Sequence, residues 1–487
     1  MKKNTIKINT ENKFQQIDNF GASGAWSIDP IGIEWGKEKK NEIADLLFSK
    51  TKGIGLSLWR FNIGAGSTRT CADTIPDPWR RVECFKEEED GDYDWSKQAG
   101  QQWFLEAAAE RGVEQFLAFV NSPPIWATKN GKGHHLKGNK DSTNLKEGYE
   151  EKFAKFLVDI LKHFEEEKGI KFDYISPVNE PTWKWEGTQE GCRYNNQQIK
   201  KVIKVLDNFL KQEAIDVEID APEAVELKAL LDDDLYKKLT GKDEVYNKGC
   251  NQFGKGKYRE YIKDFLGDQE IKEILGNKVA GHSYWSDNNL YKLRKYLKEN
   301  LERYNGKYWA SEYCIMNNGR DIGMDSALKM AKVMHSDLAI ANASAWHWWL
   351  ALSPYDFKDG LLYTDYTETG EKNIITSKMF WTFGNYSKFI RPGANRVELR
   401  VEDDSDLMGS AYIDSDQERL VMVFVNDGNN DIEVKFDVNF SNDKAIDKLT
   451  PHLTDEENDL QEKSAINIGS TYKVPKKSIL TFTGDFQ

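Results

Sequence analysis

The feature that most constrains the fold is an alternation of strand-like runs and helical patterns between about residues 16 and 390. Most of the strand-like runs lack polar alternation, which is typical of buried parallel strands. They lie at 17–22, 55–62, 115–120, 173–178, 217–221, 279–284, 307–311 and 343–348. Eight strands that alternate with helices predict an α/β fold, a (β/α)8 barrel. A doubly wound open sheet is the alternative.

The helical patterns between these runs are regular. Residues 149–170 carry one apolar stripe at the i, i+3, i+4 spacing of an amphipathic helix. The stripe consists of Phe153, Phe156, Leu157, Ile160, Leu161 and Phe164. Gly169 suits the end of this helix, since glycine readily takes the left-handed conformation found there. Residues 199–210 repeat the pattern, as a second connection of the predicted barrel requires.

The pattern changes after about residue 390. Short alternating runs separated by Asp, Asn, Gly and Ser predict an antiparallel β-sandwich. The first run, "NTIKINT", precedes the barrel and has no partner there, so we expect it to join the C-terminal sheet. The predicted domains are therefore a barrel at 16–388 and a β-sandwich side domain built from 1–15 and 389–487.

Composition excludes several classes of function. The net charge of −13 disfavours nucleic acid and anionic lipid as partners, because phosphate contacts need a basic face. The chain has no apolar run long enough to span a membrane and no apolar segment after its first lysines, so we expect a cytoplasmic protein. A secreted protein whose leader has been removed is the alternative. The five scattered cysteines, without a CxxC pair, suit a reducing compartment. Nothing in the sequence predicts an oligomeric state.

Two glutamates stand where predicted strands end. Glu180 in "SPVNEP" follows the fourth strand, and Glu312 in "ASEYC" follows the seventh. Barrel enzymes carry their chemistry at the carboxyl ends of the strands, and the fourth and seventh strands lie across the barrel mouth from each other. A pair of carboxylates flanking the scissile bond is what glycoside hydrolysis requires. We predict that Glu180 and Glu312 are catalytic; the alternative is that each forms an ordinary strand-end salt bridge.

Neighbouring residues suggest how this pair is supported. The Asn179 amide can hydrogen-bond a sugar 2-hydroxyl, a contact that strengthens in the transition state. Pro181 stiffens the exit from the strand by fixing φ. Arg60 lies near the end of the second strand, where it can pair with Glu312 and hold it ionised as a nucleophile.

Aromatic residues are abundant, with 15 Trp, 20 Tyr and 24 Phe, and several lie at predicted strand ends. His282 and Tyr284 close the sixth strand, and the Tyr284 hydroxyl can hydrogen-bond the nucleophile; His282 alone is more often a core residue. Trp346 and Trp348 close the eighth strand, where either can floor the sugar subsite. Trp126 follows the third strand and can wall the cleft. We predict that these five residues bind substrate.

No metal or organic cofactor is predicted. The glycine-rich "NIGAGS" lacks a phosphate-binding pattern, and no HExxH motif occurs. The paired histidines at 134–135 are interpreted as part of a polar loop rather than a metal site. Long loops at 64–95, 122–148 and 223–257 are expected to shape the sugar subsites.

Taken together, these segments resemble glycoside hydrolase family 30, a retaining family with a (β/α)8 barrel and a side β-sandwich. The segments that carry the resemblance are "QIDNFGASGAWS", "LSLWRFNIGAGS", "NSPPIWAT", "SPVNEP", "GHSYW", "ASEYC" and "AWHWW". The resemblance implies that Glu180 is the acid/base and Glu312 the nucleophile. It assigns supporting roles to Asn179, Arg60, Trp126 and Tyr284. Retention by double displacement then predicts carboxyl groups about 5 to 5.5 Å apart, whereas about 8 Å or more would indicate inversion.

Within this family the likeness is greatest to the endo-β-1,6-galactanase-like group, on "GASGAW" and "PWRRVECF". The expected partner is thus an oligosaccharide or polysaccharide of the β-1,6-galactan type. Glucuronoxylanase, β-xylosidase and β-1,6-glucanase specificities remain alternatives; a uronate pocket would draw on Arg69, Arg80, Arg81 and Arg193. Two alternatives from other classes are a non-catalytic carbohydrate-binding protein and a metal-dependent barrel hydrolase.

Overall fold

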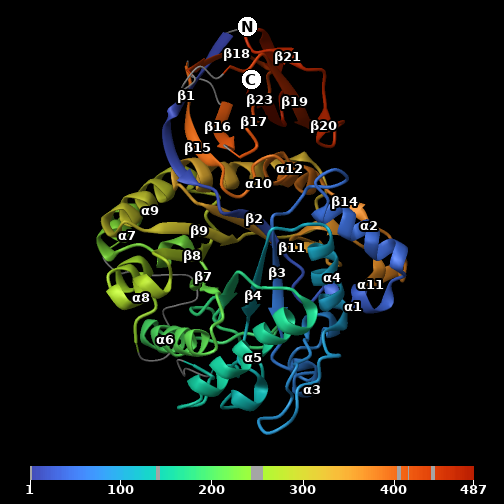
Figure 1. Ribbon diagram of the computed structural model, residues 1–487, viewed down its shortest axis with the longest axis vertical. Helices are drawn as coiled ribbons and strands as arrows, with labels where there is room; N and C mark the ends of the chain where they lie inside the picture. Colours follow the sequence, from blue (N-terminus) through green and yellow to red (C-terminus); the bar gives the residue numbers. More distant parts are fainter. Residues whose placement is uncertain are drawn as a thin grey trace. The chain divides into compact units, whose positions relative to one another are not determined.

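A computed structural model describes residues 3–138, 143–242, 256–402, 407–414, 416–439 and 445–486 (Figure 1). Parts of two predicted loops, residues 139–142 and 243–255, lie outside the described residues. The chain divides into two compact units, which we describe separately. One, the site unit, comprises Ala22–Asn41 and Leu58–Tyr313. The other, the sheet unit, comprises Met1–Gly21, Glu42–Ser57 and Cys314–Gln487.

Parallel strands form the framework of the site unit. Their bounds are β3 (Leu58–Ile63), β4 (Gln115–Val120), β5 (Tyr174–Ser176), β6 (Glu218–Ile219), β7 (Pro222–Ala224), β8 (Lys278–His282) and β9 (Lys307–Glu312). β3, β4, β5 and β6 pair in parallel in that order. β7, β8 and β9 form a second parallel run. Within the run predicted at 217–221 only β6 is a strand, and β7 begins beyond it at Pro222, which has no amide hydrogen for the ladder.

Helices alternate with these strands along the chain, as the sequence predicts. They are α1 (Ile28–Glu34), α3 (Ser67–Thr70), α4 (Ala99–Glu110), α5 (Glu150–Lys168), α6 (Asn196–Gln212), α7 (Asp233–Thr240), α8 (Gln269–Ile274) and α9 (Leu290–Tyr304). The whole apolar stripe predicted for α5 is buried, and Gly169 ends the helix with φ of 65°. At α6, Asn195 accepts from the Gln198 amide while the Gln198 side chain accepts from the Asn195 amide, which forms a capping box.

The sheet unit contains a large mixed sheet. Its strands are β1 (Lys3–Gln16), β15 (Asn395–Val401), β16 (Leu407–Asp414), β17 (Arg419–Asn426), β18 (Ile432–Asn439), β19 (Lys448–Thr454), β20 (Gln461–Glu462), β21 (Ile466–Asn467), β22 (Thr471–Val474) and β23 (Ser478–Asp485). Their main order is β20-β19-β23-β17-β16-β15-β1-β18-β22. Figure 1 shows β1 beside β15, with which it pairs antiparallel, while its pairing with β18 is parallel. The expected entry of the N-terminal strand into the C-terminal sheet is therefore confirmed.

The sheet unit also contains the elements between residues 314 and 388. These are β10 (Ile315–Asn318), α10 (Met324–His335), β11 (Ala345–Ser353), β12 (Phe357–Lys358), β13 (Gly360–Tyr363), α11 (Tyr366–Thr369), β14 (Ile375–Thr376) and α12 (Lys378–Ser387). β2 (Asn19–Ser23) and α2 (Lys37–Phe48) contain residues assigned to each unit. The predicted domains, 16–388 and 1–15 with 389–487, are another partition of the same chain and stay a prediction.

The architecture is a (β/α)8 barrel with a side β-sandwich. The parallel strands that alternate with helices form the barrel, and the separate mixed sheet forms the β-sandwich. Among the described residues, no helix combines the length and the apolarity that crossing a bilayer would require.

Candidate active site

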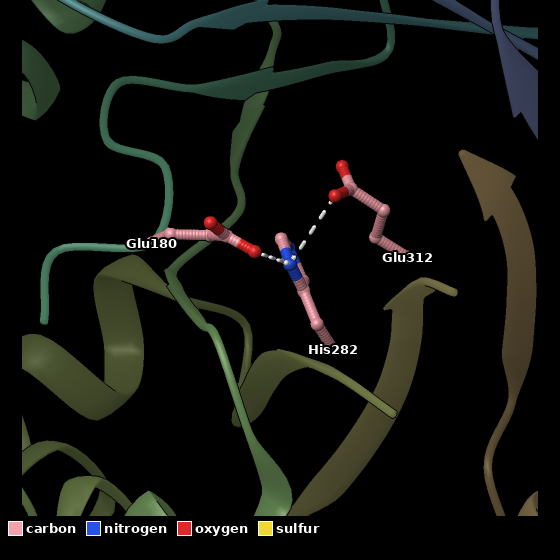
Figure 2. Close-up of side chains that lie close together, drawn as sticks. All are labelled: Glu180, His282 and Glu312. Carbon is pink, nitrogen blue, oxygen red and sulfur yellow. Dashed lines mark hydrogen bonds and ion pairs between the residues drawn. The ribbon is translucent and has the colours of Figure 1, made fainter. Parts of the chain in front are cut away.

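The structure brings Glu180 and Glu312 together. Glu312 is the last residue of β9, and Glu180 lies shortly after the end of β5. One oxygen of each carboxylate and one ring nitrogen of His282 all lie within 4.8 Å of one another. Figure 2 shows His282 between the two glutamates. Both residues are buried, with Glu180 7% and Glu312 3% exposed.

Two donors hold the Glu312 carboxylate. Arg60 Nη1 donates to Oε2 at 2.8 Å, and the Tyr284 hydroxyl donates to Oε1 at 2.8 Å. Burial alone would lower the pKa of Arg60, but the charges of Glu312 and Glu223 outweigh it and raise that pKa. The guanidinium therefore stays charged, and both oxygens of Glu312 accept hydrogen bonds, as an ionised carboxylate does. The pairing of Arg60 with Glu312 is the one that the sequence predicts.

Glu180 has a different environment. Its backbone has φ of 43°, a left-handed conformation that is unfavourable for a residue with a Cβ. Two hydrogen bonds hold it there: its amide donates to the Glu223 carbonyl at 3.0 Å, and its carbonyl accepts from Trp185 Nε1 at 3.0 Å. Burial raises the pKa of the Glu180 carboxyl, and the charges of Glu312 and Glu223 add to this against the opposing effect of His282. A carboxyl with a raised pKa keeps its proton to a higher pH than an ordinary carboxyl does, as a general acid requires.

Asn179 is fixed by a neighbour from another strand end. Its Nδ2 donates to Oδ1 of Asn121, which directly follows β4, at 3.0 Å. The Asn179 Oδ1 is buried and has no hydrogen-bond partner within the described part of the chain. Since buried polar atoms are nearly always satisfied in the working state of a protein, this acceptor is available to a ligand hydroxyl.

Two residues of the site, Glu223 and Ser311, are absent from the sequence-based predictions. Glu223 Oε2 lies 2.9 Å from His282 Nε2, and the Ser311 hydroxyl donates to the same oxygen. Glu223 follows Pro222 just after the run predicted at 217–221. It thus carries the same signal as Glu180, a carboxylate where a strand ends.

His282 is the centre of this group. Its Nδ1 lies 3.0 Å from Glu180 Oε1 and 3.4 Å from Glu312 Oε1. Burial alone would lower the pKa of His282, but the three surrounding carboxylates raise it to about 10. The sequence-based choice between a core histidine and a substrate ligand misses this arrangement, in which both ring nitrogens face carboxylates.

The other predicted substrate-binding residues make contacts of a different kind. Trp126 is half-buried, donates from Nε1 to the Lys86 carbonyl at 2.9 Å and packs edge-on against Phe156 of α5. With Tyr93 it lines a cavity of about 200 Å³. Neither contact involves Glu180 or Glu312, and the role of Trp126 in substrate binding stays a prediction.

Trp346 and Trp348 belong to β11 in the sheet unit. Both are fully buried, and their Nε1 atoms donate to Asp337 Oδ2 at 2.9 Å and to the Asp359 carbonyl at 2.6 Å. Buried tryptophans with satisfied N–H groups are typical of a packed interior. Their predicted role beneath a sugar stays a prediction.

The spacing of Glu180, His282 and Glu312 is also that of cation ligands. Here, however, the oxygens of Glu312 accept from Arg60 and Tyr284, and the pKa of His282 favours an imidazolium, which has no lone pair for a metal. Hydrogen bonds and ion pairs therefore explain why Glu180, His282 and Glu312 lie so close together.

A known protein family matches most of the chain. The profile described as O-Glycosyl hydrolase family 30 matches residues 3–363. An endo-beta-1,6-galactanase from Hypocrea rufa is 27% identical over 236 residues, which cover 43% of this chain and 47% of that protein. The chain thus spans about half the length of this curated relative.

Two solved structures share the fold along nearly the whole chain. A conserved exported protein from Bacteroides fragilis has a TM-score of 0.85 at 31% identity and covers 98% of this chain and 100% of its own. The catalytic domain of GH30 xylanase C from Talaromyces cellulolyticus has a TM-score of 0.71 at 19% identity, with 99% of both chains covered. The second likeness concerns the fold alone.

Proposed function

Because the chain belongs to O-glycosyl hydrolase family 30, we propose that it hydrolyses β-glycosidic bonds with retention of anomeric configuration. The observation that carries the proposal is the contrast between two adjacent carboxylates. Both oxygens of Glu312 accept hydrogen bonds, from Arg60 and Tyr284, whereas burial raises the pKa of Glu180. This is the division between nucleophile and acid that the reaction requires.

In the first step, a Glu312 oxygen attacks the anomeric carbon as the bond to the leaving oxygen breaks. Glu180 gives its proton to that oxygen, and a glycosyl ester on Glu312 results. In the second step, water attacks the same carbon, Glu180 takes the proton of the water, and Glu312 leaves as a carboxylate. The close approach of the two carboxylates supports retention, because inversion needs room for a water between them.

Asn179 is the proposed ligand of the sugar hydroxyl next to the anomeric carbon. Its unsatisfied buried Oδ1 accepts from the hydroxyl, while its Nδ2 stays anchored on Asn121. Because the buried Asn179 Oδ1 gains a hydrogen-bond partner only when substrate is present, this contact stabilises the bound state relative to the free enzyme.

We propose a substrate of the β-1,6-galactan type, attacked within the chain. Support comes from the Hypocrea rufa relative, which is described as an endo-beta-1,6-galactanase. Two of the four arginines that a uronate pocket would need are engaged elsewhere: Arg69 pairs with Glu88 at 2.7 Å, and Arg193 is fully buried against His135. These contacts favour a neutral sugar over glucuronoxylan.

A product assay on a substrate panel tests the proposal. The panel contains β-1,6-galactan and its oligosaccharides, β-1,6-glucan, glucuronoxylan, and aryl β-galactoside, β-glucoside and β-xyloside. We expect products from galactan, β-configured when first released, from wild type and from Glu110→Gln, an exposed control on α4. Glu312→Gln should release none, and a chelator should not change the rate. If the wild type released no product from any substrate of the panel, the result would contradict the proposal and favour a carbohydrate-binding protein.

The cytoplasmic location predicted from the sequence stays a prediction. The similar chain from Bacteroides fragilis is described as exported, which favours testing the location directly. Fractionation of the native cells, with an antibody against the chain to detect it in each fraction, would show where the protein is located.

A further inference from the structure

Glu223 and His282 are buried charged residues to which the double displacement itself gives no part. Both are fully buried, as is Ser311, which donates to Glu223. They come from three adjacent strands, β7, β8 and β9. A fully buried carboxylate and imidazole are retained only where they are paired, so their partners indicate what they do.

The partners of His282 fix its protonation state. Nε2 faces Glu223 Oε2 at 2.9 Å, and Nδ1 faces Glu180 Oε1 at 3.0 Å. A neutral imidazole has one N–H and can donate to only one of these carboxyl groups. An imidazolium donates to both at once. The geometry therefore favours a cation, and the rise of the His282 pKa to about 10 agrees with it.

The charges around His282 balance when Glu180 is protonated. The charged and titratable groups of the cluster are Arg60, Glu180, Asp220, Glu223, Lys278, His282, Tyr284 and Glu312. The cations Arg60 and His282 face the anions Glu312 and Glu223. Lys278 Nζ lies 3.4 Å from Asp220 Oδ1. A protonated Glu180 leaves the buried cluster neutral, and this is the form that acid catalysis needs.

We propose that Glu223, acting through His282, is a positioning residue that decides which oxygen of Glu180 carries the catalytic proton. The inference rests on the proposed role of Glu180 as the acid. Glu223 keeps His282 doubly protonated, so Nδ1–H donates to Oε1 of Glu180. Since Oε1 is then an acceptor, the proton of the acid resides on Oε2, the oxygen turned away from His282.

Removal of the Glu223 charge should move the proton of Glu180 from Oε2 to Oε1. In Glu223→Gln the side-chain carbonyl can still accept from Nε2–H, but without the anion His282 becomes neutral. The bare Nδ1 then accepts a hydrogen bond, and the proton of Glu180 moves to Oε1, away from the leaving group. Loss of the cationic neighbour also raises the pKa of Glu180, because the hydrogen bond and charge of His282 oppose that rise in the native site.

The first test needs no substrate. ¹⁵N spectra of the full chain, labelled at its seven histidines, report the protonation of each ring nitrogen. At pH 8 an ordinary histidine is neutral, so an imidazolium signal at that pH identifies His282. We expect it in wild type and in Glu223→Asp, which keeps the charge, and not in Glu223→Gln. Glu190→Gln, at a buried glutamate that accepts from the Ala65 and Ser67 amides, should keep it.

Two results of this experiment would overturn the inference. One is a neutral His282 in wild type at pH 8, which decides the question even if Glu223→Gln does not fold. The other is an imidazolium that survives in a folded Glu223→Gln.

The second test measures the acid itself, with the substrate that the wild type cleaves from the panel. For Glu223→Gln we expect kcat on unactivated substrate to fall by about tenfold or more, since a general acid contributes roughly 10² to 10⁴. The 2,4-dinitrophenyl glycoside needs no proton to leave and should be nearly unaffected. The basic limb of the pH profile should move up by roughly one pH unit, and Glu223→Asp should restore most of it.

Comparison with Glu180→Gln separates the two proposals. If Glu180→Gln cleaves unactivated substrate as wild type does, the proposed function fails. If Glu180→Gln is impaired while Glu223→Gln has the wild-type pH profile and leaving-group dependence, the role of Glu223 alone is refuted.

Discussion

At the scale of single residues, the site is defined by what each carboxylate oxygen faces. Both Glu312 oxygens meet donors, from Arg60 and Tyr284, whereas Glu180 gains a raised pKa from burial. The sequence could place Glu180, Glu312, Arg60 and Tyr284, because each stands at a predicted strand end. It could not show that His282 is shared between carboxylates, since that contact depends on side-chain directions from strands distant in sequence.

Tyr284→Phe should lower activity without unfolding the protein. The change removes one donor from Glu312 Oε1, and we expect kcat to fall roughly tenfold because the carboxylate is less well oriented. The free energy of unfolding should fall by only about 1 kcal/mol. Tyr304→Phe is the matched control, since its hydroxyl donates to Asp232 outside the site. Steady-state kinetics and urea unfolding measure both, and equal kcat losses in the two variants would contradict the assignment.

The paired charges of His282 and Glu223 predict how stability depends on pH. Because the folded-state pKa of His282 is raised to about 10, its stabilising effect is complete below its ordinary value of 6.5 and is lost as the pH rises through 10. The pKa of Glu223 is lowered to about 2, against burial, chiefly by His282 and Arg60, so Glu223 stays ionised across that range.

Wild type should therefore lose its stability advantage over Glu223→Gln between pH 7 and pH 10. Urea unfolding at a series of pH values measures the difference in the free energy of unfolding. A difference that stays constant or grows over this interval would show that His282 is not held as a cation by Glu223.

At the scale of helices and strands, local patterns predicted the elements better than their pairing. The stripe of α5, its end at Gly169 and the repeated pattern in α6 follow from residues close in sequence. The separate strand β7 is not predicted, because it begins at Pro222, just beyond the run at 217–221, and proline is uncommon inside a central strand. The parallel pairing of β1 with β18 was also missed, because it joins segments more than 400 residues apart.

The capping box of α6 gives a prediction at this scale. Asn195→Ala removes the acceptor for the Gln198 amide and should lower the free energy of unfolding by about 1 kcal/mol. Asn208→Ala, an exposed position inside the same helix, should leave stability unchanged or raise it slightly, since alanine is the better helix former there. Chemical denaturation compares the two, and similar effects would argue against the cap.

At the scale of the whole molecule, the two ends of the chain share one sheet. β1 lies between β15 and β18 in the strand order, and Ile6 and Ile8 join the apolar core of that sheet. The sequence predicted this association because the first strand had no partner in the barrel. It did not predict how the contacts divide the chain, since the compact sheet unit also contains β11 and α12.

Ile6→Ala should therefore destabilise the protein far more than its neighbour Lys7→Ala. Ile6 is fully buried in the sheet core, and truncation of such a side chain costs roughly 2 to 5 kcal/mol. Lys7 is exposed, so its truncation should change the free energy of unfolding by about 0.5 kcal/mol or less. Equal effects in thermal or urea unfolding would contradict the position of β1 within the sheet.

The most direct test of the central claim is the anomeric configuration of the glycosyl azide that each catalytic variant makes. It uses the activated aryl β-glycoside of the sugar that the wild type accepts. In Glu180→Ala the glycosyl ester on Glu312 still forms, and azide should replace water to give the β-glycosyl azide. In Glu312→Ala azide should attack the substrate directly from the nucleophile's side and give the α-glycosyl azide. The reverse configurations, or an α-azide from both variants, would contradict the assignment of Glu312 as nucleophile and Glu180 as acid/base.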